Sequence, residues 1–158
     1  MKLAPRALPE LLAGRRIASV TGTNGKTTTT HFLTAAVRAG TPDSQRSVVT
    51  NADGANLYHG IVSALGQAPN ATIAVLETDE RVVADVVAMG SPEVLVLLNF
   101  SRDQLDRNHE LTFLGRDWRA ALEKAAEHGP TVVANACDPL IVWVCQKARH
   151  VIWVDTKP

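Results

Sequence analysis

The chain has 158 residues, a length that suits one domain with a buried core of its own. Its 16 Lys and Arg residues balance 16 Asp and Glu residues, so charge gives no reason to expect nucleic acid or a membrane surface as a partner. There is no run of about 18 apolar residues, so we expect no transmembrane segment, and the N-terminus lacks the apolar core of a signal peptide. Cys137 and Cys145 do not form a C-x-x-C pair, so we expect no zinc site from them, and free thiols without a secretion signal favour a cytoplasmic location.

Short apolar runs alternate with longer amphipathic segments along the chain. Near-continuous apolar runs are typical of parallel strands that are covered on both faces. The predicted strands are Arg16–Val20, Ser47–Thr50, Thr72–Leu76, Val94–Leu98, Thr131–Ala134 and Val151–Val154. The predicted helices are Lys26–Arg38, Leu57–Leu65, Glu80–Met89, Leu111–His128 and Pro139–Lys147. This order predicts one α/β domain over residues 1–158, with a mostly parallel sheet of about six strands and helices on both faces.

Two of the predicted helices carry an apolar face. In the segment 80–89 this face consists of Val82, Val83, Val86 and Val87. In the segment 111–128 it consists of Phe113, Leu114, Trp118, Ala121, Leu122 and Ala125. Because an apolar stripe of this period normally faces the core, we expect these side chains to pack inward.

Polar clusters follow four of the predicted strands. They are the segments 21–28, 51–56, 77–80 and 99–106. In open parallel sheets, ligands bind beyond the carboxyl ends of the strands. The sequence therefore predicts a ligand site on one rim of the sheet, to which all four clusters contribute.

The first cluster is the strongest functional signal. It reads TGTNGKTT, between a predicted strand and a predicted helix. Glycines allow backbone N–H groups to turn toward an anion, and a helix N-terminus adds its own free N–H groups. We expect Lys26 to reach the outer phosphates of ATP and the Thr27 hydroxyl to bind Mg²⁺. The expected nucleotide contacts in this loop are Gly22, Thr23, Asn24, Gly25, Lys26, Thr27 and Thr28.

The loop differs from the common Walker pattern, because two residues rather than four separate Gly22 from Gly25. The alternative is a plain turn between strand and helix. The string TGTNGKTT, however, resembles the loop of the Mur ligases and the related folylpolyglutamate synthases. Those enzymes use ATP to phosphorylate a carboxylate, and an amine then attacks the acyl phosphate. The resemblance implies the fold of their central ATPase domain and a catalytic role for Lys26.

Two further positions extend this resemblance. Glu77 closes a predicted strand where Mur ligases place a magnesium-binding glutamate, which implies a catalytic and metal-binding role here; by itself it would be a solvated strand end. The segment 135–138 matches an Asn-Ala-Asp-Asp segment of the family, whose asparagine lies near the adenine. Cys137 replaces the first aspartate, and Asn135 is retained. Asn135 is therefore a nucleotide-binding candidate, with a simple turn residue as the alternative.

The segment 99–107 narrows the resemblance. Gln104 stands where amino-acid-adding Mur ligases carry a metal-binding histidine, and Arg119 stands where they carry a carbamylated lysine. An arginine cannot form that carbamate. The segments 51–56, 77–80 and 102–107 are instead similar to the MurT family, the ligase subunits of lipid II isoglutaminyl synthases. This resemblance implies that the α-carboxyl of D-glutamate in lipid II is activated and amidated with ammonia from a GatD-like glutaminase, at the inner face of the membrane.

Members of the MurT family are longer and carry a four-cysteine zinc ribbon and a C-terminal domain. We therefore expect this chain to be an isolated ATP-binding core that binds no zinc and does not amidate by itself. Asp103 and Asp106 are catalytic candidates that would orient ammonia or a metal-bound water, or else cap the next helix. Asn51, Asn56 and His59 are candidates for facing the substrate.

Two other functions stay open from the sequence. The first is an amino-acid ligase of the Mur or folylpolyglutamate type, against which Gln104 and Arg119 argue. The second is a non-catalytic nucleotide-binding module that regulates a partner. An ordinary P-loop kinase is disfavoured by the short spacing of the glycines and by the absence of an arginine-rich lid.

Overall fold

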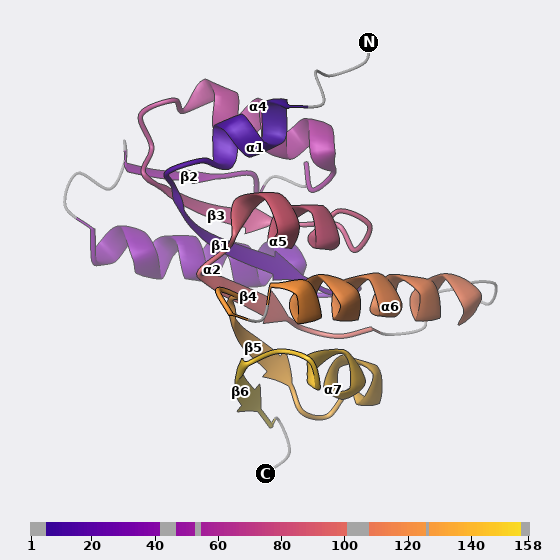
Figure 1. Cartoon of the computed structure of the whole chain (residues 1–158). Coiled ribbons are helices and arrows are strands. Elements are labelled where there is room, and N and C mark those ends of the chain that lie inside the picture. Colours follow the sequence, from indigo (N-terminus) through magenta and orange to yellow (C-terminus); the bar gives the residue numbers. More distant parts are fainter. Residues whose placement is uncertain (1–5, 42–46, 53–54, 101–107, 126, 156–158) are drawn as a thin grey trace.

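The computed structural model of the chain describes residues 6–41, 47–52, 55–100, 108–125 and 127–155 (Figure 1). Its centre is a six-stranded sheet in the order β2-β3-β1-β4-β5-β6, in which every pairing is parallel. The strands are β1 Arg16–Thr21, β2 Val48–Thr50, β3 Ile73–Glu77, β4 Val94–Leu97, β5 Thr131–Asn135 and β6 His150–Val154. The predicted α/β fold with a parallel sheet is confirmed, and strand ends shift by one residue at most.

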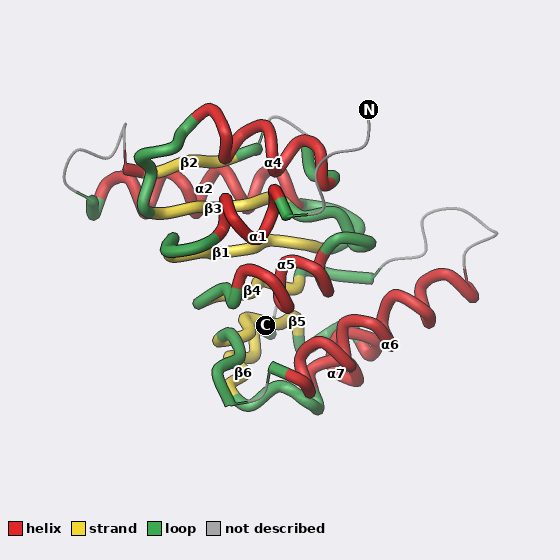
Figure 2. Tube along the Cα trace, turned by 45° about the horizontal axis from the view of Figure 1, so that its top comes forward, coloured by secondary structure: helices red, strands yellow, loops and turns green. Residues whose placement is uncertain are grey.

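The helices described in the structure are α1 Ala7–Leu12, α2 Lys26–Ala39, α4 Tyr58–Gln67, α5 Val83–Gly90, α6 Asn108–Lys124 and α7 Pro139–Cys145. α2 packs on one face of the sheet, against β1, β2 and β3. The other five pack on the opposite face, as Figures 1 and 2 show. Both faces therefore carry helices, but very unequally.

Two apolar clusters fill the space between the sheet and the five helices. One joins α1 and α4 to β1 and β3, with Leu8, Ile17 and Leu76 at its centre. The other joins α6 and α7 to β4 and β5, around Trp118 and Leu95. Each cluster uses alternate residues of a strand, as the pleat of a sheet requires. The neighbouring residues of β1 and β3 face α2, whereas those of β5 and β6 are more open.

The face of β4, β5 and β6 on the α2 side is less well covered in the described part of the chain. Val96 and Val133 are half-buried there. On β6, Ile152 and Val154 are 55% and 44% exposed. A parallel sheet normally has helices on both faces, so this half of the sheet presents unusual apolar surface.

Several expectations about the helices are wrong, among them the bounds of α6, which covers Asn108–Lys124 rather than the expected Leu111–His128. α1 was not expected, because it is only six residues long and includes Pro9; it forms because Leu8 and Leu12 are buried against α4 and α5. α5 begins at Val83 rather than Glu80, because the Asp79 side chain accepts a hydrogen bond from Arg81 N and holds a turn there. Phe113 does not face the core and is 63% exposed, whereas Trp118 and Leu122 of the same stripe are buried.

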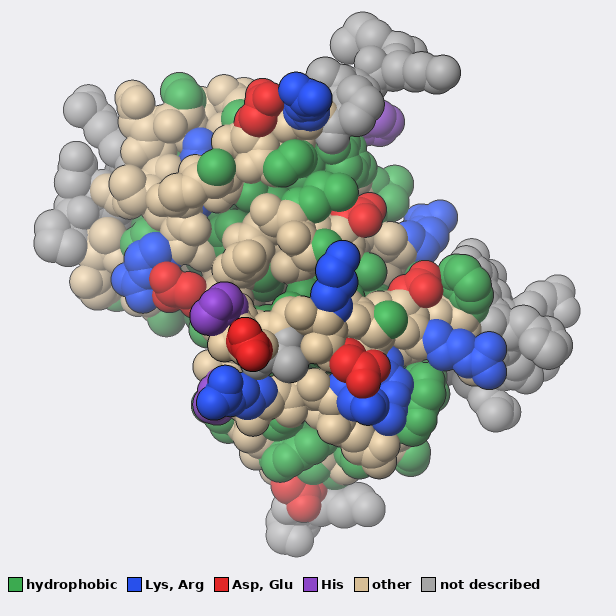
Figure 3. Space-filling model, viewed as in Figure 1, with side chains coloured by type: hydrophobic (Ala, Val, Ile, Leu, Met, Phe, Trp, Pro, Cys, Tyr) green, Lys and Arg blue, Asp and Glu red, His purple; other side chains and the backbone are tan. Residues whose placement is uncertain are grey.

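The charged side chains are spread over the surface. On the face that carries α5 and α6, acidic and basic groups are interspersed and neither sign gathers into a patch (Figure 3). Several pair with each other, including Arg16 with Glu93 at 2.9 Å and Lys147 with Glu123 at 2.8 Å. Exposed pairs of this kind contribute little to stability.

Candidate nucleotide-binding site

The phosphate loop leaves β1 at Thr21 and enters α2 at Lys26. The strand before the loop, β1, lies between β3 and β4. At this point the order of the strands switches, because β2 and β3 are added on one side of β1 and β4, β5 and β6 on the other. Ligands usually bind at such a switch point in these folds. Gly22 and Gly25 have φ values of 141° and 85°, which side-chain-bearing residues rarely adopt. A Cβ on Gly22 would lie only 2.9 Å from Asn99 N and from Leu98 Cβ. The glycine is therefore required both by backbone geometry and by the closeness of the next strand.

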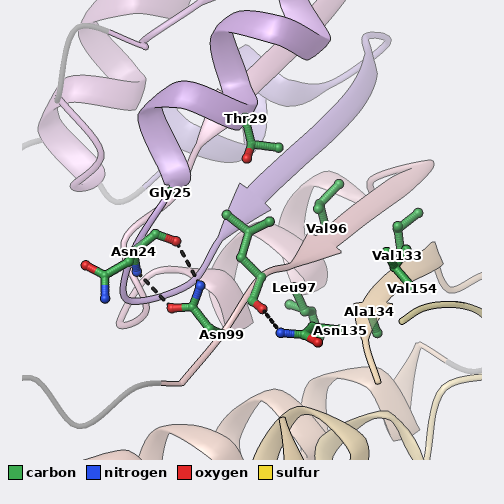
Figure 4. Close-up of a pocket in the computed structure, with 11 residues that line it drawn as sticks. Asn24, Gly25, Thr29, Val96, Leu97, Asn99, Val133, Ala134, Asn135 and Val154 are labelled. Atoms are coloured by element: carbon green, nitrogen blue, oxygen red, sulfur yellow. Dashed lines mark hydrogen bonds between the residues drawn. The ribbon is translucent and has the colours of Figure 1, made fainter. Parts of the chain in front are cut away.

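Asn99 holds the loop in place from the end of β4 (Figure 4). Its Oδ1 accepts a hydrogen bond from Asn24 N at 2.9 Å, and its Nδ2 donates to Asn24 O at 3.0 Å. Its backbone carbonyl accepts a third from Thr23 N at 2.9 Å. The sequence places Asn99 in a polar cluster, but nothing in it singled out this residue; only the pairing of β4 with β1 brings it to the loop.

Lys26 lies back over the loop. Its Nζ donates to Gly22 O at 2.7 Å and to Thr23 O at 3.4 Å, and it is 3.3 Å from Glu80 Oε1. The ammonium is therefore already positioned at the loop. Of the threonines that follow, Thr30 is buried and donates its hydroxyl to Lys26 O at 2.8 Å, so its polar group is satisfied within the helix.

The N-terminus of α2 is open for an anion. Its N-cap residue, Gly25, provides no side-chain cap, so the first backbone N–H groups of the helix are not capped by it. Thr27 and Thr28 lie exposed in this first turn. Thr27, the predicted Mg²⁺ ligand, therefore lies at the uncapped start of this helix.

Glu77 ends β3 directly beside the start of the loop. Its register partner on β1 is Val20, and Thr78 N donates to Val20 O at 2.9 Å. The side chain is 2% exposed. Oε1 accepts a hydrogen bond from Asn56 Nδ2 at 2.9 Å, whereas Oε2 is buried without a partner in the described structure. A buried carboxylate oxygen without a partner is costly, so this atom is a natural ligand for a cation.

Asn51 fixes the main chain of Glu77. Its Oδ1 accepts from Glu77 N at 2.8 Å, and its Nδ2 donates to Glu77 O at 2.8 Å and to Ala55 O at 2.9 Å. Asn51 and Asn56 therefore hold the backbone and the carboxylate of Glu77, respectively. Both were expected as candidates for substrate contact; the contacts that the structure shows for them are with Glu77 and its surroundings.

His59 lies on α4, exposed, with its ring edge-on to Tyr58 at 6.4 Å. It lines a groove of about 620 Å³ along the outer edge of β2, together with Arg38, Thr50 and Asn51. His59 and Asn51 therefore line the same groove.

Asp79 is charged and well held at the same rim. Burial by itself raises the pKa of this carboxyl, but the hydrogen bonds from the Arg81 side chain and backbone, with the positive charges of Arg81 and Lys26, bring the pKa below its usual value. The Asp79 amide donates to Asn56 O at 2.9 Å. This contact links the segment after β3 to the loop after β2.

A pocket of about 260 Å³ opens between the phosphate loop and the ends of β4 and β5 (Figure 4). Asn24, Gly25 and Thr29 form its polar side. Its apolar side includes Val96, Leu98, Val133, Ala134 and Val154. An apolar slot that begins at a phosphate loop has the character of a site for a flat, largely apolar ring such as a nucleotide base.

Asn135 lies at the end of this pocket. Its Nδ2 donates to Leu98 O at 2.9 Å, and its Oδ1 accepts from Cys137 N at 2.9 Å, so the amide is oriented by the main chain. Asp138 has a structural role: it caps α7 and accepts from Phe100 N at 2.6 Å. Cys137 donates its thiol to Asp155 Oδ1 at 3.0 Å.

The structure does not test the two catalytic candidates of the segment 99–107. Asp103, Asp106 and Gln104 lie outside the described residues. Arg119 joins two helices: its guanidinium donates to Trp143 O and to Gln146 Oε1 and lies 5.1 Å from the centre of the Trp143 ring. Among the described residues, no group of three or more His, Cys, Asp and Glu side chains is arranged to hold a metal ion.

Residues 20–156 match the family model described as "Mur ligase middle domain". The chain belongs to this family. Within it, the chain is 33% identical over 127 residues to the MurT subunit of lipid II isoglutaminyl synthase (glutamine-hydrolyzing) from Staphylococcus aureus, which covers 79% of this chain and 28% of that protein. It is 35% identical over 137 residues to the MurT subunit from Streptococcus pneumoniae, covering 84% and 29%. The family and the resemblance to MurT are thereby confirmed.

Other Mur ligases are also similar. A UDP-N-acetylmuramate–L-alanine ligase from Saccharopolyspora erythraea is 35% identical over 134 residues, covering 84% of this chain and 25% of that protein. A solved UDP-N-acetylmuramoyl-L-alanyl-D-glutamate–2,6-diaminopimelate ligase superposes with a TM-score of 0.66 at 22% identity, covering 97% of this chain and 34% of the other. MurF from Acinetobacter baumannii superposes with a TM-score of 0.65 at 18% identity, covering 93% and 32%. At these identities the structures show the shared fold.

The chain spans less than a third of the length of the MurT proteins it matches. Of the helices described, none is both long enough and apolar enough to cross a membrane.

Proposed function

We propose that this chain is the ATP- and Mg²⁺-binding core of a glutamine-dependent ligase that amidates the α-carboxyl of D-glutamate in lipid II, giving D-isoglutamine. One observation carries the proposal: a buried carboxylate with a free oxygen, Glu77, lies beside a glycine-bracketed phosphate loop in a chain that resembles MurT. The loop also lies where the strand order switches from one side of β1 to the other, which supports a nucleotide site at this place.

In this proposal, the loop from Gly22 to Thr28 binds the phosphates of ATP. Backbone N–H groups of the loop and of the α2 N-terminus donate to phosphate oxygens, and Asn99 keeps the loop in the shape that allows this. Lys26 leaves its carbonyl contacts to pair with the outer phosphates. The base enters the apolar pocket, with Asn135 at its far end.

The residues present fit a magnesium ion. Mg²⁺ is usually held by one or two protein oxygens together with phosphates and waters, so it does not need a cluster of side chains. Glu77 Oε2 and the Thr27 hydroxyl are the proposed protein ligands, and Asn56 keeps the other oxygen of Glu77 turned away. Bound there, the ion would neutralise charge that develops on the phosphates during transfer.

The proposed chemistry has two steps. An oxygen of the substrate carboxylate attacks the γ-phosphorus of ATP, so the bond to ADP breaks and an acyl phosphate forms. Ammonia then attacks the acyl carbon, phosphate leaves with the bonding electron pair, and the amide remains after loss of a proton. Lys26 stabilises the negative charge of the transferring group. Asp103 and Asp106 are proposed to orient the ammonia, and Asn51, Asn56 and His59 to border the substrate.

The proposal extends to the surroundings of the chain. Ammonia would come from a GatD-like glutaminase subunit, and the complete enzyme would work on lipid II in the cytoplasm, at the inner face of the membrane. Zinc would belong to a ribbon of the longer family members and not to this chain. The isolated chain is proposed to bind nucleotide weakly and not to amidate.

Calorimetric titration tests the first half of the proposal. We expect the folded chain to bind a non-hydrolysable ATP analogue in the presence of Mg²⁺, with a dissociation constant between about 1 μM and 1 mM. Circular dichroism confirms folding in the same sample. Absence of binding at millimolar ligand by the folded chain would contradict the proposal.

A reconstituted assay tests the reaction. The full-length protein with its glutaminase, lipid II, ATP and glutamine labelled with ¹⁵N in its amide is expected to yield a stem peptide that contains the label. Replacement of glutamine by free amino acids should give no product. Incorporation of an amino acid instead would identify an amino-acid ligase, and the absence of ATP turnover in the complete complex would identify a regulatory module.

A further inference from the structure

Glu80 reaches the lysine of the phosphate loop from the segment that joins β3 to α5. Its Oε1 lies 3.3 Å from Lys26 Nζ, and the side chains of Lys26 and Glu80 are only 14% and 17% exposed. The Lys147–Glu123 pair on the surface is different, with exposures of 40% and 58%. Exposed pairs contribute little, whereas a pair that is largely out of water interacts strongly. The Lys26–Glu80 pair is therefore placed to influence what Lys26 binds.

The main chain of Glu80 is anchored. Trp118 Nε1 donates a hydrogen bond to Glu80 O at 2.8 Å. Trp118 is itself 1% exposed and packs on Phe100, with ring centroids 4.3 Å apart. One residue earlier, the Asp79 amide is bonded to Asn56 O. Because these contacts hold both Asp79 N and Glu80 O, the main chain that carries the Glu80 side chain is fixed beside the loop.

Among the residues that the structure describes, those around Lys26 carry more negative than positive charge. Glu77, Asp79 and Glu80 come from one short segment, and Arg81 is paired with Asp79 at 2.9 Å. A metal-free nucleotide would bring its phosphates to the ammonium that Glu80 already contacts, so carboxylate and phosphate would repel each other. A nucleotide that carries Mg²⁺ brings two positive charges with it, and the repulsion is largely offset.

We propose that Glu80 is a selectivity residue, which makes the phosphate loop discriminate against metal-free nucleotide in favour of the magnesium complex. This inference rests on the proposed nucleotide-binding function. Glu80 acts by competing for Lys26 and by repelling uncompensated phosphate charge, and it is not required as a ligand of the metal. Lys26 thus stays paired in the empty site and is released only to a ligand whose own charge is partly neutralised.

The decisive experiment compares wild type with Glu80→Gln by titration with ADP, once with Mg²⁺ and once with EDTA. The substitution keeps the shape of the side chain and an oxygen that accepts from Lys26, and removes only the charge. We expect metal-free ADP to bind about tenfold more tightly and Mg²⁺–ADP to change less than about threefold. The matched control is Glu123→Gln, which removes the acid of the exposed Lys147 pair and should change neither affinity.

Two outcomes would overturn the inference. Equal changes with and without Mg²⁺ would mean that Glu80 does not discriminate between the two forms. Weaker binding of Mg²⁺–ADP with unchanged metal-free binding would mean that Glu80 contacts the metal. If the folded wild type binds neither form, the proposed function fails and the selectivity fails with it.

The contact itself has a test that needs no nucleotide. An amine-reactive reagent is added to the ligand-free protein, and the modification of Lys26 is followed by mass spectrometry, with Lys147 as the internal reference. We expect Glu80→Gln to label at Lys26 about fivefold faster, because the ammonium is no longer held in an ion pair. Faster labelling without any ADP binding would separate failure of the proposed function from failure of the contact. An unchanged labelling rate would contradict the contact, whatever ADP does.

Discussion

The two halves of the candidate site are built in different ways. The phosphate half, at the ends of β1, β2 and β3, is polar and hydrogen-bonded: Glu77 is 2% exposed and is held by Asn51 and Asn56. The base half, at the ends of β4, β5 and β6, is lined mainly by apolar side chains, of which Val154 is 44% exposed. Charge must be held in a fixed geometry away from water to act on phosphates, whereas the flat faces of a base pack on apolar surface and its edge needs only a few polar partners.

The sheet explains this contrast. β1, β2 and β3 have helices on both faces, so polar groups at their ends are buried. Asn51 and Glu77 Oε1 have hydrogen-bond partners there, whereas Thr21 Oγ1, Thr50 Oγ1 and Glu77 Oε2 have none in the described structure. β4, β5 and β6 have their well-packed cluster on one face, and the pocket opens on the other. The phosphate half is therefore preorganised, and the base half leaves room for a ligand.

The largest expected effect is the loss of the loop cation. Lys26→Ala should weaken binding of an ATP analogue with Mg²⁺ by about a hundredfold, because it removes a charge-assisted contact to phosphate. Calorimetry measures the affinity, and circular dichroism at the temperature of the titration shows that the variant is folded. Lys147→Ala, which removes an exposed lysine just after α7, should leave the affinity unchanged. A similar loss of affinity in this variant would point to an unspecific charge effect.

Gly22→Ala should destabilise the phosphate half. The new Cβ would meet Asn99 N and Leu98 Cβ at 2.9 Å, and φ is 141°, so we expect the free energy of unfolding to fall by about 2–4 kcal/mol. Gly14→Ala is the control for backbone strain alone, because its φ is 74° and nothing lies within 4 Å. That change should cost about 1 kcal/mol. Equal losses of the free energy of unfolding for Gly22→Ala and Gly14→Ala, measured in urea, would show that the closeness of Gly22 to the end of β4 is unimportant.

Two asparagine substitutions separate the halves. Asn99→Ala removes the two side-chain hydrogen bonds to Asn24, so it should weaken the binding of both ADP and inorganic pyrophosphate by about tenfold. Asn135 lines the base pocket, so Asn135→Ala should weaken the binding of ADP by about threefold and leave the binding of pyrophosphate unchanged. Titration with both ligands measures this. Loss of pyrophosphate binding in Asn135→Ala would contradict the division of the site.

The smallest effect concerns the two thiols. Burial raises the pKa of the Cys145 thiol to about 12, while Cys137 is exposed. Since the thiolate is the nucleophile, iodoacetamide at pH 8 should modify Cys137 and spare Cys145 until the chain unfolds. The folded state favours the neutral Cys145 thiol, so its stabilising contribution is present below the ordinary pKa of 9.0 and is lost as pH rises toward 12. Rapid labelling of Cys145 in the folded protein would show that the apolar cluster around Trp118 and Leu95 unfolds locally and exposes the thiol.

Much of the fold was predictable because each strand is a short apolar run, and four of the strands end in a polar cluster. The loop glycines and Lys26 were predictable as well, since only a narrow set of residues allows such a turn. The exposure of Phe113 was not predictable, because an apolar stripe on a helix does not show how wide the buried face is. The helix α1 was not predictable either, because so short a helix depends on packing partners such as α4.

The sequence by itself determined the parallel α/β fold, the phosphate loop and the family to which the chain belongs, because these depend on local patterns of residues. Only the tertiary structure decided which residues support the site. Asn99, Glu80 and Trp118 lie far from the loop in sequence, and the strand order and helix packing bring them together. The free oxygen of Glu77 likewise depends on how Asn51 and Asn56 fold over the end of β3, which a spacing of residues does not encode.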